Sequence, residues 1–145
     1  MTRTPTNAIG LFTIALVLGC SGSAAAPGTV KAAGTVKLNG GPLAGAQVTF
    51  YPASADTALA SQAATDDSGH YELQTHVGGG KFKPGVAPGK YAVSITKLDT
   101  ANVKNTFAPP KNLLPARYAD PKTSKLTADI SPSSQTPFDF ELTSQ

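Results

Sequence analysis

Short runs of alternating apolar and polar residues recur along this chain, and they constrain its fold more than any other feature. The clearest run is KYAVSITK, residues 90–97. Its apolar set is Tyr91, Val93 and Ile95, and its polar set includes Lys90, Ser94 and Thr96. A strand places successive side chains on opposite faces, so this alternation is typical of a strand with one buried face.

Six other stretches show the same period-two pattern, and the weakest of them is ASQAAT. They are residues 29–38, 46–51, 60–65, 70–75, 126–130 and 137–142. No stretch has the wider spacing of an amphipathic helix. Half-buried strands of this kind pair into two sheets around a shared core. We therefore predict an all-β fold, a β-sandwich of about seven strands.

Size and charge limit the classes of function. A chain of 145 residues has room for one ordinary domain and a short appendage. The net charge is only +3, and the lysines and arginines are scattered rather than clustered. Nucleic-acid binding needs a basic patch or stripe, so we expect no nucleic-acid partner.

The N-terminus is predicted to be an export signal that lies outside the fold. The run AIGLFTIALVL is apolar and uncharged for eleven residues, and it follows Arg3. That is the length of a signal-peptide core, whereas a helix needs about 20 residues to span a bilayer. We therefore assign residues 1–19 to a signal peptide.

The residues that end this apolar run resemble the lipobox of bacterial lipoproteins. VLGC places a small residue, Gly19, before Cys20, which is the single cysteine of the chain. In lipoproteins the cysteine carries the lipid and becomes the new N-terminus. The resemblance implies lipidation of Cys20, although ordinary cleavage near SAAAP is the alternative. Residues 20–28 would then be a flexible tether, and residues 29–145 would form the domain.

The stretch TDDSGHYEL, residues 65–73, raises the question of a metal or acid–base site. Asp66 to Gly69 separate two expected strands, and aspartate, serine and glycine favour hairpin turns. A calcium loop would continue alternating oxygen ligands over about twelve residues. His70 and His76 would lie about 20 Å apart along an extended strand, too far for one metal ion. We therefore predict a turn here, with no metal and no cofactor.

Three motifs together resemble a carboxypeptidase regulatory-like domain, a transthyretin-like β-sandwich module. They are GTVKLNGGPLAGAQVTFYP, ATDDSGHYEL and PGKYAVSITK. The resemblance implies turns at Gly34, Gly45 and Gly69, core positions at Leu43 and Val48, and a corner role for Tyr91. The later LLPARYADPKTSKL and FDFEL resemble small lipoproteins of this type that recur in planctomycete bacteria. Such domains are generally accessory modules, so the resemblance implies no particular reaction.

Enzymes with related folds are the least favoured alternative. A transthyretin-like ureide hydrolase ends in a tyrosine-arginine-glycine-serine motif, whereas this chain ends in ELTSQ. Intradiol dioxygenases hold iron with two tyrosines and two histidines, and the chain has four tyrosines and two histidines. However, Tyr71 and Tyr91 occupy expected core positions. No nucleophile elbow is present. We expect no catalytic residues.

The connection between residues 98 and 125 is long for a compact domain, and loops of this length are often functional. Arg117, Tyr118 and Asp120 offer a cation, an aromatic ring and a carboxylate within ARYADPKTS. They form a candidate partner-binding loop. The alternative, which we favour, is that the connection covers a sheet edge.

The sequence thus predicts a membrane-anchored, exported lipoprotein of the bacterial cell envelope, with a non-catalytic structural or protein-binding role. Its partners would be the membrane, through the lipid, and an envelope protein or polysaccharide. A carbohydrate-binding module is the second possibility. Sugar platforms favour large exposed aromatic rings, and in a chain without tryptophan only Tyr51 and Tyr118 are plausible substitutes.

Overall fold

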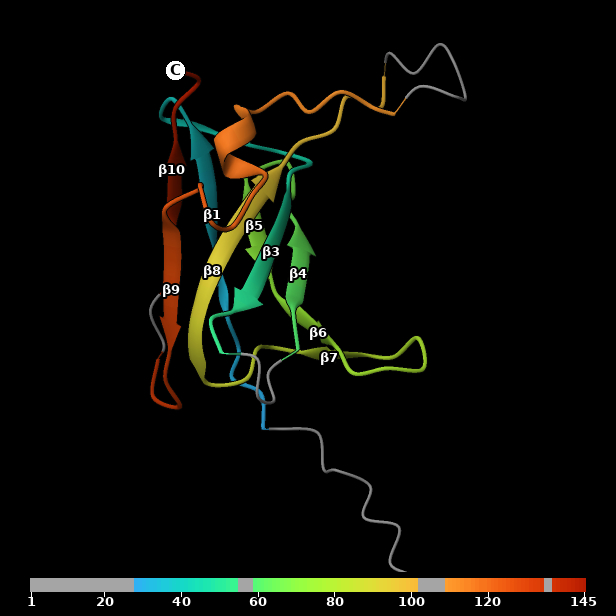
Figure 1. The fold of residues 1–145 in the computed structure, drawn as a ribbon, viewed down its shortest axis with the longest axis vertical. Helices are drawn as coiled ribbons and strands as arrows, with labels where there is room; N and C mark the ends of the chain where they lie inside the picture. The colour runs from blue at the N-terminus through green and yellow to red at the C-terminus, as the bar shows by residue number, and fades with distance from the viewer. Residues whose placement is uncertain (1–27, 55–58, 102–108, 135–136) are drawn as a thin grey trace, which may run out of the picture.

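Two β-sheets pack face to face in the computed structural model, which describes residues 28–54, 59–101, 109–134 and 137–145. Most strands follow the long axis of the molecule (Figure 1). The one helical element in this part of the chain is a single 3₁₀ turn, η1 (Ala116–Tyr118). The predicted all-β sandwich is therefore confirmed.

The larger sheet has six strands in the order β7-β6-β4-β3-β8-β9, and every pairing in it is antiparallel. Its central pair, β3 and β8, matches six residues of one strand to six of the other. The bounds of its strands, in sheet order, are β7 (Phe82–Pro84), β6 (Gln74–His76), β4 (Ser61–Ala64), β3 (Gln47–Pro52), β8 (Gly89–Thr96) and β9 (Leu126–Ile130).

The smaller sheet is organised around β1 (Ala33–Leu38). One side of β1 pairs in parallel with β10 (Phe140–Leu142) near the end of the chain. The remaining two strands are β2 (Gly41–Pro42) and β5 (His70–Glu72), both antiparallel to β1. The first strand of the domain is therefore held directly by the last.

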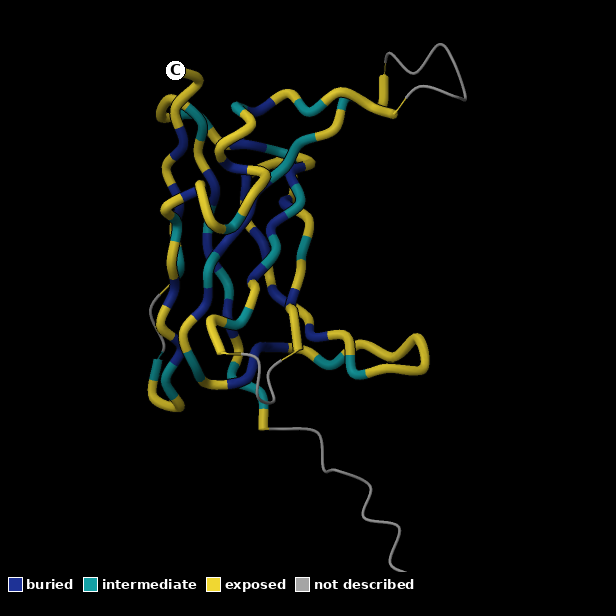
Figure 2. The backbone as a smooth tube through the Cα atoms, in the orientation of Figure 1, coloured by how far each residue is buried: buried dark blue, intermediate teal, exposed yellow. Residues whose placement is uncertain are grey.

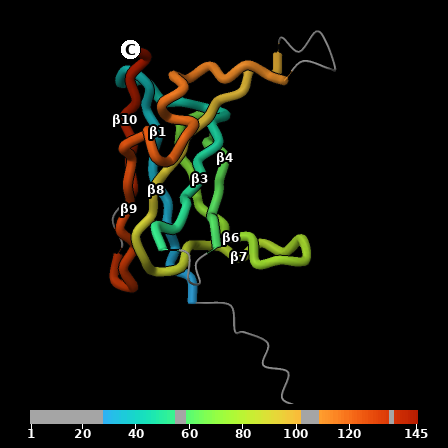
Figure 3. Tube along the Cα trace, viewed as in Figure 1, coloured from blue at the N-terminus to red at the C-terminus, as the bar shows by residue number. Residues whose placement is uncertain are grey.

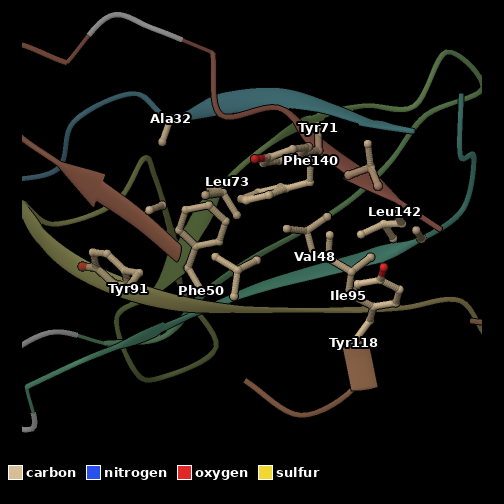
Figure 4. Close-up of a cluster of buried hydrophobic side chains, with 14 of the residues drawn as sticks. Ala32, Val48, Phe50, Tyr71, Leu73, Tyr91, Ile95, Tyr118, Phe140 and Leu142 are labelled. Carbon is tan, nitrogen blue, oxygen red and sulfur yellow. The ribbon is translucent and has the colours of Figure 1, made fainter. Parts of the chain in front are cut away.

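Inward-facing residues of both sheets meet around Phe50, which is fully buried. Its ring lies 5.9 Å from that of Tyr91 and 6.0 Å from that of Phe140, measured between centroids. Tyr71 and Phe138 also contact it, so aromatic rings from both sheets converge there (Figure 4). Aromatic pairs at such distances contribute about 0.5–1.5 kcal/mol beyond the area they bury.

Within the described residues the structure has ten strands, where the sequence predicted about seven. Two additional strands, β2 and β7, are very short and lie in stretches rich in glycine and proline. The expected strand at 70–75 is divided into β5 and β6, because the chain passes from one sheet to the other at Leu73. Tyr71, Leu73 and Thr75 stay buried across this change.

The two ends of the sandwich are formed by different segments of the chain. Residues 28–30 lie at one end, close to the β6–β7 hairpin, which projects sideways (Figures 1 and 3). The tip of this hairpin is exposed (Figure 2). Residues 97–101 and 109–115 lie at the opposite end, together with the C-terminus.

None of the helical structure described is long and apolar enough to cross a membrane.

Candidate functional site

The acidic stretch after β4 is a hydrogen-bonded turn, as predicted. Oδ1 of Asp66 accepts hydrogen bonds from the hydroxyl and amide of Ser68 and from the amide of His70, at 2.7, 2.9 and 2.9 Å. These bonds, with the Ser68 hydroxyl foremost, hold the pKa of Asp66 below its ordinary value. Gly69 closes the turn with a φ of +76°. The carboxylate therefore has an internal role in the turn.

The two histidines lie on different sheets. His70 begins β5 and lines a groove of about 540 Å³ with Lys31, Thr35 and Pro132. His76 ends β6, where its ring contacts that of Phe82 edge-on at 5.2 Å. Within the described residues, no three or more His, Cys, Asp or Glu side chains are grouped so that they could hold a metal ion.

Tyr118, one of the three candidate loop residues, packs into the core rather than facing solvent. Its ring is only 7% exposed and points toward Ile95 and Leu142 (Figure 4). Its hydroxyl accepts a 3.1 Å hydrogen bond from the amide of Thr143. Contacts with Thr143, followed by the Arg117 guanidinium, lower the pKa of this phenol. The ring is therefore too buried to serve as a sugar platform.

Arg117 and Asp120 also make contacts within the domain. The Arg117 guanidinium donates hydrogen bonds to the carbonyl and hydroxyl oxygens of Thr143 at 3.1 and 3.0 Å, and it lies 4.9 Å from the centre of the Tyr118 ring. Oδ1 of Asp120 accepts a 2.8 Å hydrogen bond from the amide of Lys122. The connection thus closes the end of the sandwich where the chain terminates (Figure 1).

The tyrosines considered as iron ligands have internal partners. The Tyr71 hydroxyl donates to the carbonyl of Phe138 at 2.6 Å, and the Tyr91 hydroxyl donates to the carbonyl of Ala87 at 2.8 Å. Burial, together with the nearby charge of Asp139, raises the pKa of the Tyr71 phenol, and burial raises that of Tyr91. Both phenols are therefore held protonated and are engaged in stabilising the fold.

A shallow, mostly polar hollow lies on the outer face of the six-stranded sheet. We call it the glutamine hollow; it is lined by Gln47, Gln62, Ala64, Glu72, Gln74 and Phe82, with a volume of about 360 Å³. Gln62 and Gln74 are direct neighbours on β4 and β6. Phe82 is 51% exposed. Glu72 is the single ionised residue of this lining, and Lys31 pairs with it at 3.0 Å.

The glutamine hollow was not predicted from the sequence. Its residues belong to five strands, β3 to β7, and register brings together those that lie on the six-stranded sheet. The outward positions of Gln47 and Gln62 could have been found from the alternation with buried neighbours such as Val48. Phe82 gave no strand signal because glycines precede it and Pro84 follows.

Cys20, with the rest of residues 1–27, lies outside the described residues. No family model, curated protein or solved structure matches this chain. The lipoprotein signal and the carboxypeptidase regulatory-like resemblance therefore stay predictions.

Proposed function

We propose that the chain is a lipid-anchored β-sandwich module of the bacterial cell envelope, with a non-catalytic structural or protein-binding role. One observation carries the proposal. Cys20, the single cysteine, follows an uncharged apolar run directly, in the VLGC sequence expected of a lipidated cysteine. The fold is compatible with this role, because the isolated β-bridge between Val30 and Val86, at the start of the described domain, comes only ten residues after Cys20 (30 − 20).

The side chains that could carry chemistry support a non-catalytic role. Tyr71, Tyr91 and Tyr118 use their hydroxyl groups in contacts within the domain, and Asp66 uses its carboxylate in a turn. Nothing in these contacts places a nucleophile beside a general base. The carboxypeptidase regulatory-like resemblance agrees with such a module, and we retain it as part of the proposal.

Replacing the lipidated residue tests the anchor. Cys20→Ala should abolish both the acyl mass on the mature N-terminus and the recovery of the protein in the membrane fraction. Ser23→Ala is the matched control, because it changes the same segment without removing the thiol. Wild-type protein that lacks acyl mass and stays in the soluble fraction would overturn the proposal.

Carbohydrate binding is the second candidate function, and the glutamine hollow is the observation that favours it. Amide groups can both donate and accept hydrogen bonds, which suits the hydroxyls of a neutral sugar. Phe82 adds an exposed aromatic ring at the rim. Tyr51, which is 40% exposed, follows Gln47 and Thr49 on the same face of β3.

A further inference from the structure

The β6–β7 hairpin, residues 74–84, combines apolar and basic side chains at one exposed place. Phe82 is half exposed, and Lys81 and Lys83 flank it in the chain. The tip consists of three consecutive glycines with positive φ, Gly78 to Gly80. No acidic residue occurs between Gln74 and Pro84, so the hairpin carries a local positive charge.

The Phe82 ring is held at the surface. His76 pairs with Phe82 across the hairpin, and the two rings meet edge-on at 5.2 Å. At the tip, the amide of Val77 donates to the carbonyl of Lys81 at 3.0 Å, which closes the loop. A large apolar ring fixed at the surface of an element that also carries cations is typical of segments that bind at a membrane interface.

The first described residues of the domain lie directly against this hairpin. The Thr29 hydroxyl donates a 2.8 Å hydrogen bond to the carbonyl of Pro84. Val30 and Val86 exchange two backbone hydrogen bonds, at 2.8 and 2.9 Å. Phe82 is only two residues from Pro84, so it lies at the same end of the sandwich as Thr29 (Figure 1).

The length of chain before Thr29 limits how far this end can be from the anchor. Thr29 follows Cys20 by nine residues (29 − 20), which span at most about 30 Å when fully extended. If Cys20 carries a lipid, the end that bears Thr29 is therefore tethered near the bilayer. Residues 97–101 and 109–115 lie at the far end (Figure 3).

We propose that the β6–β7 hairpin is a second membrane contact, in which Phe82 enters the headgroup region of an anionic phospholipid bilayer and Lys81 lies against the lipid phosphates. The inference rests on the proposed lipid anchor. A lipid on Cys20 tethers the domain but does not set which face it presents to the bilayer. Basic side chains near an anionic surface are attracted to it. The hairpin contact would therefore fix the orientation of the sandwich.

Because the chain contains no tryptophan, a single introduced tryptophan can serve as the fluorophore of each variant. Phe82→Trp reports on the hairpin, and Leu113→Trp is the matched control at the opposite end. The two side chains are equally exposed, at 51% and 50%. Each full-length, lipidated variant is placed on vesicles of phosphatidylethanolamine and phosphatidylglycerol, prepared with and without brominated acyl chains. Bromine quenches only fluorophores that reach the bilayer.

For Phe82→Trp we expect a blue shift and about twofold lower emission on brominated vesicles, because the ring lies at the acyl boundary. Leu113→Trp should show neither. Adding Lys81→Glu to Phe82→Trp should weaken the quenching, as should high salt or phosphatidylcholine vesicles, because each removes electrostatic attraction.

The outcomes separate this inference from the proposed function. Variants that fail to float with vesicles and carry no acyl mass overturn the anchor, and the hairpin contact with it. Variants that float but show equal emission with and without bromine overturn the hairpin contact alone. A blue shift that grows with protein density, without quenching, would place a second copy of the chain on the hairpin and would also overturn the inference.

Discussion

The phenol oxygen of Tyr118 accepts a 3.1 Å hydrogen bond from the backbone amide of Thr143. This bond joins the long connection before β9 to the last residues of the chain. Because the Tyr118 ring is also buried against Ile95 and Leu142, the connection is part of the core at this end of the sandwich.

Substitutions in the connection should therefore affect stability first. Tyr118→Ala removes a buried ring, and we expect it to lower the free energy of unfolding by about 3 kcal/mol, as core aromatic deletions do. Tyr118→Phe removes only the hydroxyl contacts, so about 1 kcal/mol is expected. Urea unfolding of the purified protein measures both values.

Arg117→Ala separates a structural role from partner binding. The hydrogen bonds of the Arg117 side chain to Thr143 are exposed, so this substitution should lower the free energy of unfolding by at most about 1 kcal/mol. If the connection is a partner surface, the same variant should capture less envelope material at an unchanged melting temperature. Unchanged capture, together with a lower melting temperature for Tyr118→Ala, would remove the partner-binding role of this loop.

Gly69 and Gly45 form a matched pair for the turn. Both have positive φ, +76° and +65°, so alanine is strained at each by about 1–2 kcal/mol. A Cβ at Gly69 would also lie 2.5 Å from the carbonyl oxygen of Val36, whereas a Cβ at Gly45 has nothing within 4 Å. Gly69→Ala should therefore lower the free energy of unfolding by about 1 kcal/mol more than Gly45→Ala does. Equal losses of unfolding free energy, measured with urea, would show that the contact between the new Cβ and the Val36 carbonyl is relieved without cost.

The Asp66 carboxylate should make stability depend on acidity. Its pKa is lowered in the folded state, so its contribution is present above the pKa of the unfolded chain, about 3.9, and is lost as pH falls through the folded value. Asp66→Ala should therefore be less stable than wild type at neutral pH, and the difference should shrink in acid. Asp67→Ala is the control, because that exposed carboxylate accepts none of the turn's hydrogen bonds. A constant difference between pH 7 and pH 3 would contradict this assignment.

The alternation of apolar and polar residues was enough to predict the longer strands, in which it is complete. Val48 and Phe50 on β3, and Tyr91, Val93 and Ile95 on β8, are all buried as expected. Ser94 differs: it belongs to the polar set of its strand but is only 4% exposed. Alternation sets the face of a side chain, whereas its burial also depends on what packs over that face.

The division at Leu73 could not be predicted, because Tyr71, Leu73 and Thr75 keep the same alternation while the chain changes sheets. Two sheets that face the same core require the same inward pattern. The glutamine hollow could not be predicted from the sequence for a related reason. Gln47, Gln62, Gln74 and Phe82 meet through the register of β3, β4, β6 and β7, and a single sequence gives no information on register between distant strands.

The glutamine hollow gives the test of carbohydrate binding. Gln62 and Gln74 are exposed neighbours, so replacing either with alanine should change stability by at most about 0.5 kcal/mol. If a neutral polysaccharide binds there, each replacement removes hydrogen bonds and should weaken binding about 2- to 10-fold on a glycan array. Thr127→Ala is the control, since Thr127 is an exposed residue of β9, the opposite edge strand of the same sheet. Wild-type protein that binds no glycan, or binding that is unchanged in both glutamine variants, would remove carbohydrate recognition from this face and leave the structural or protein-binding role.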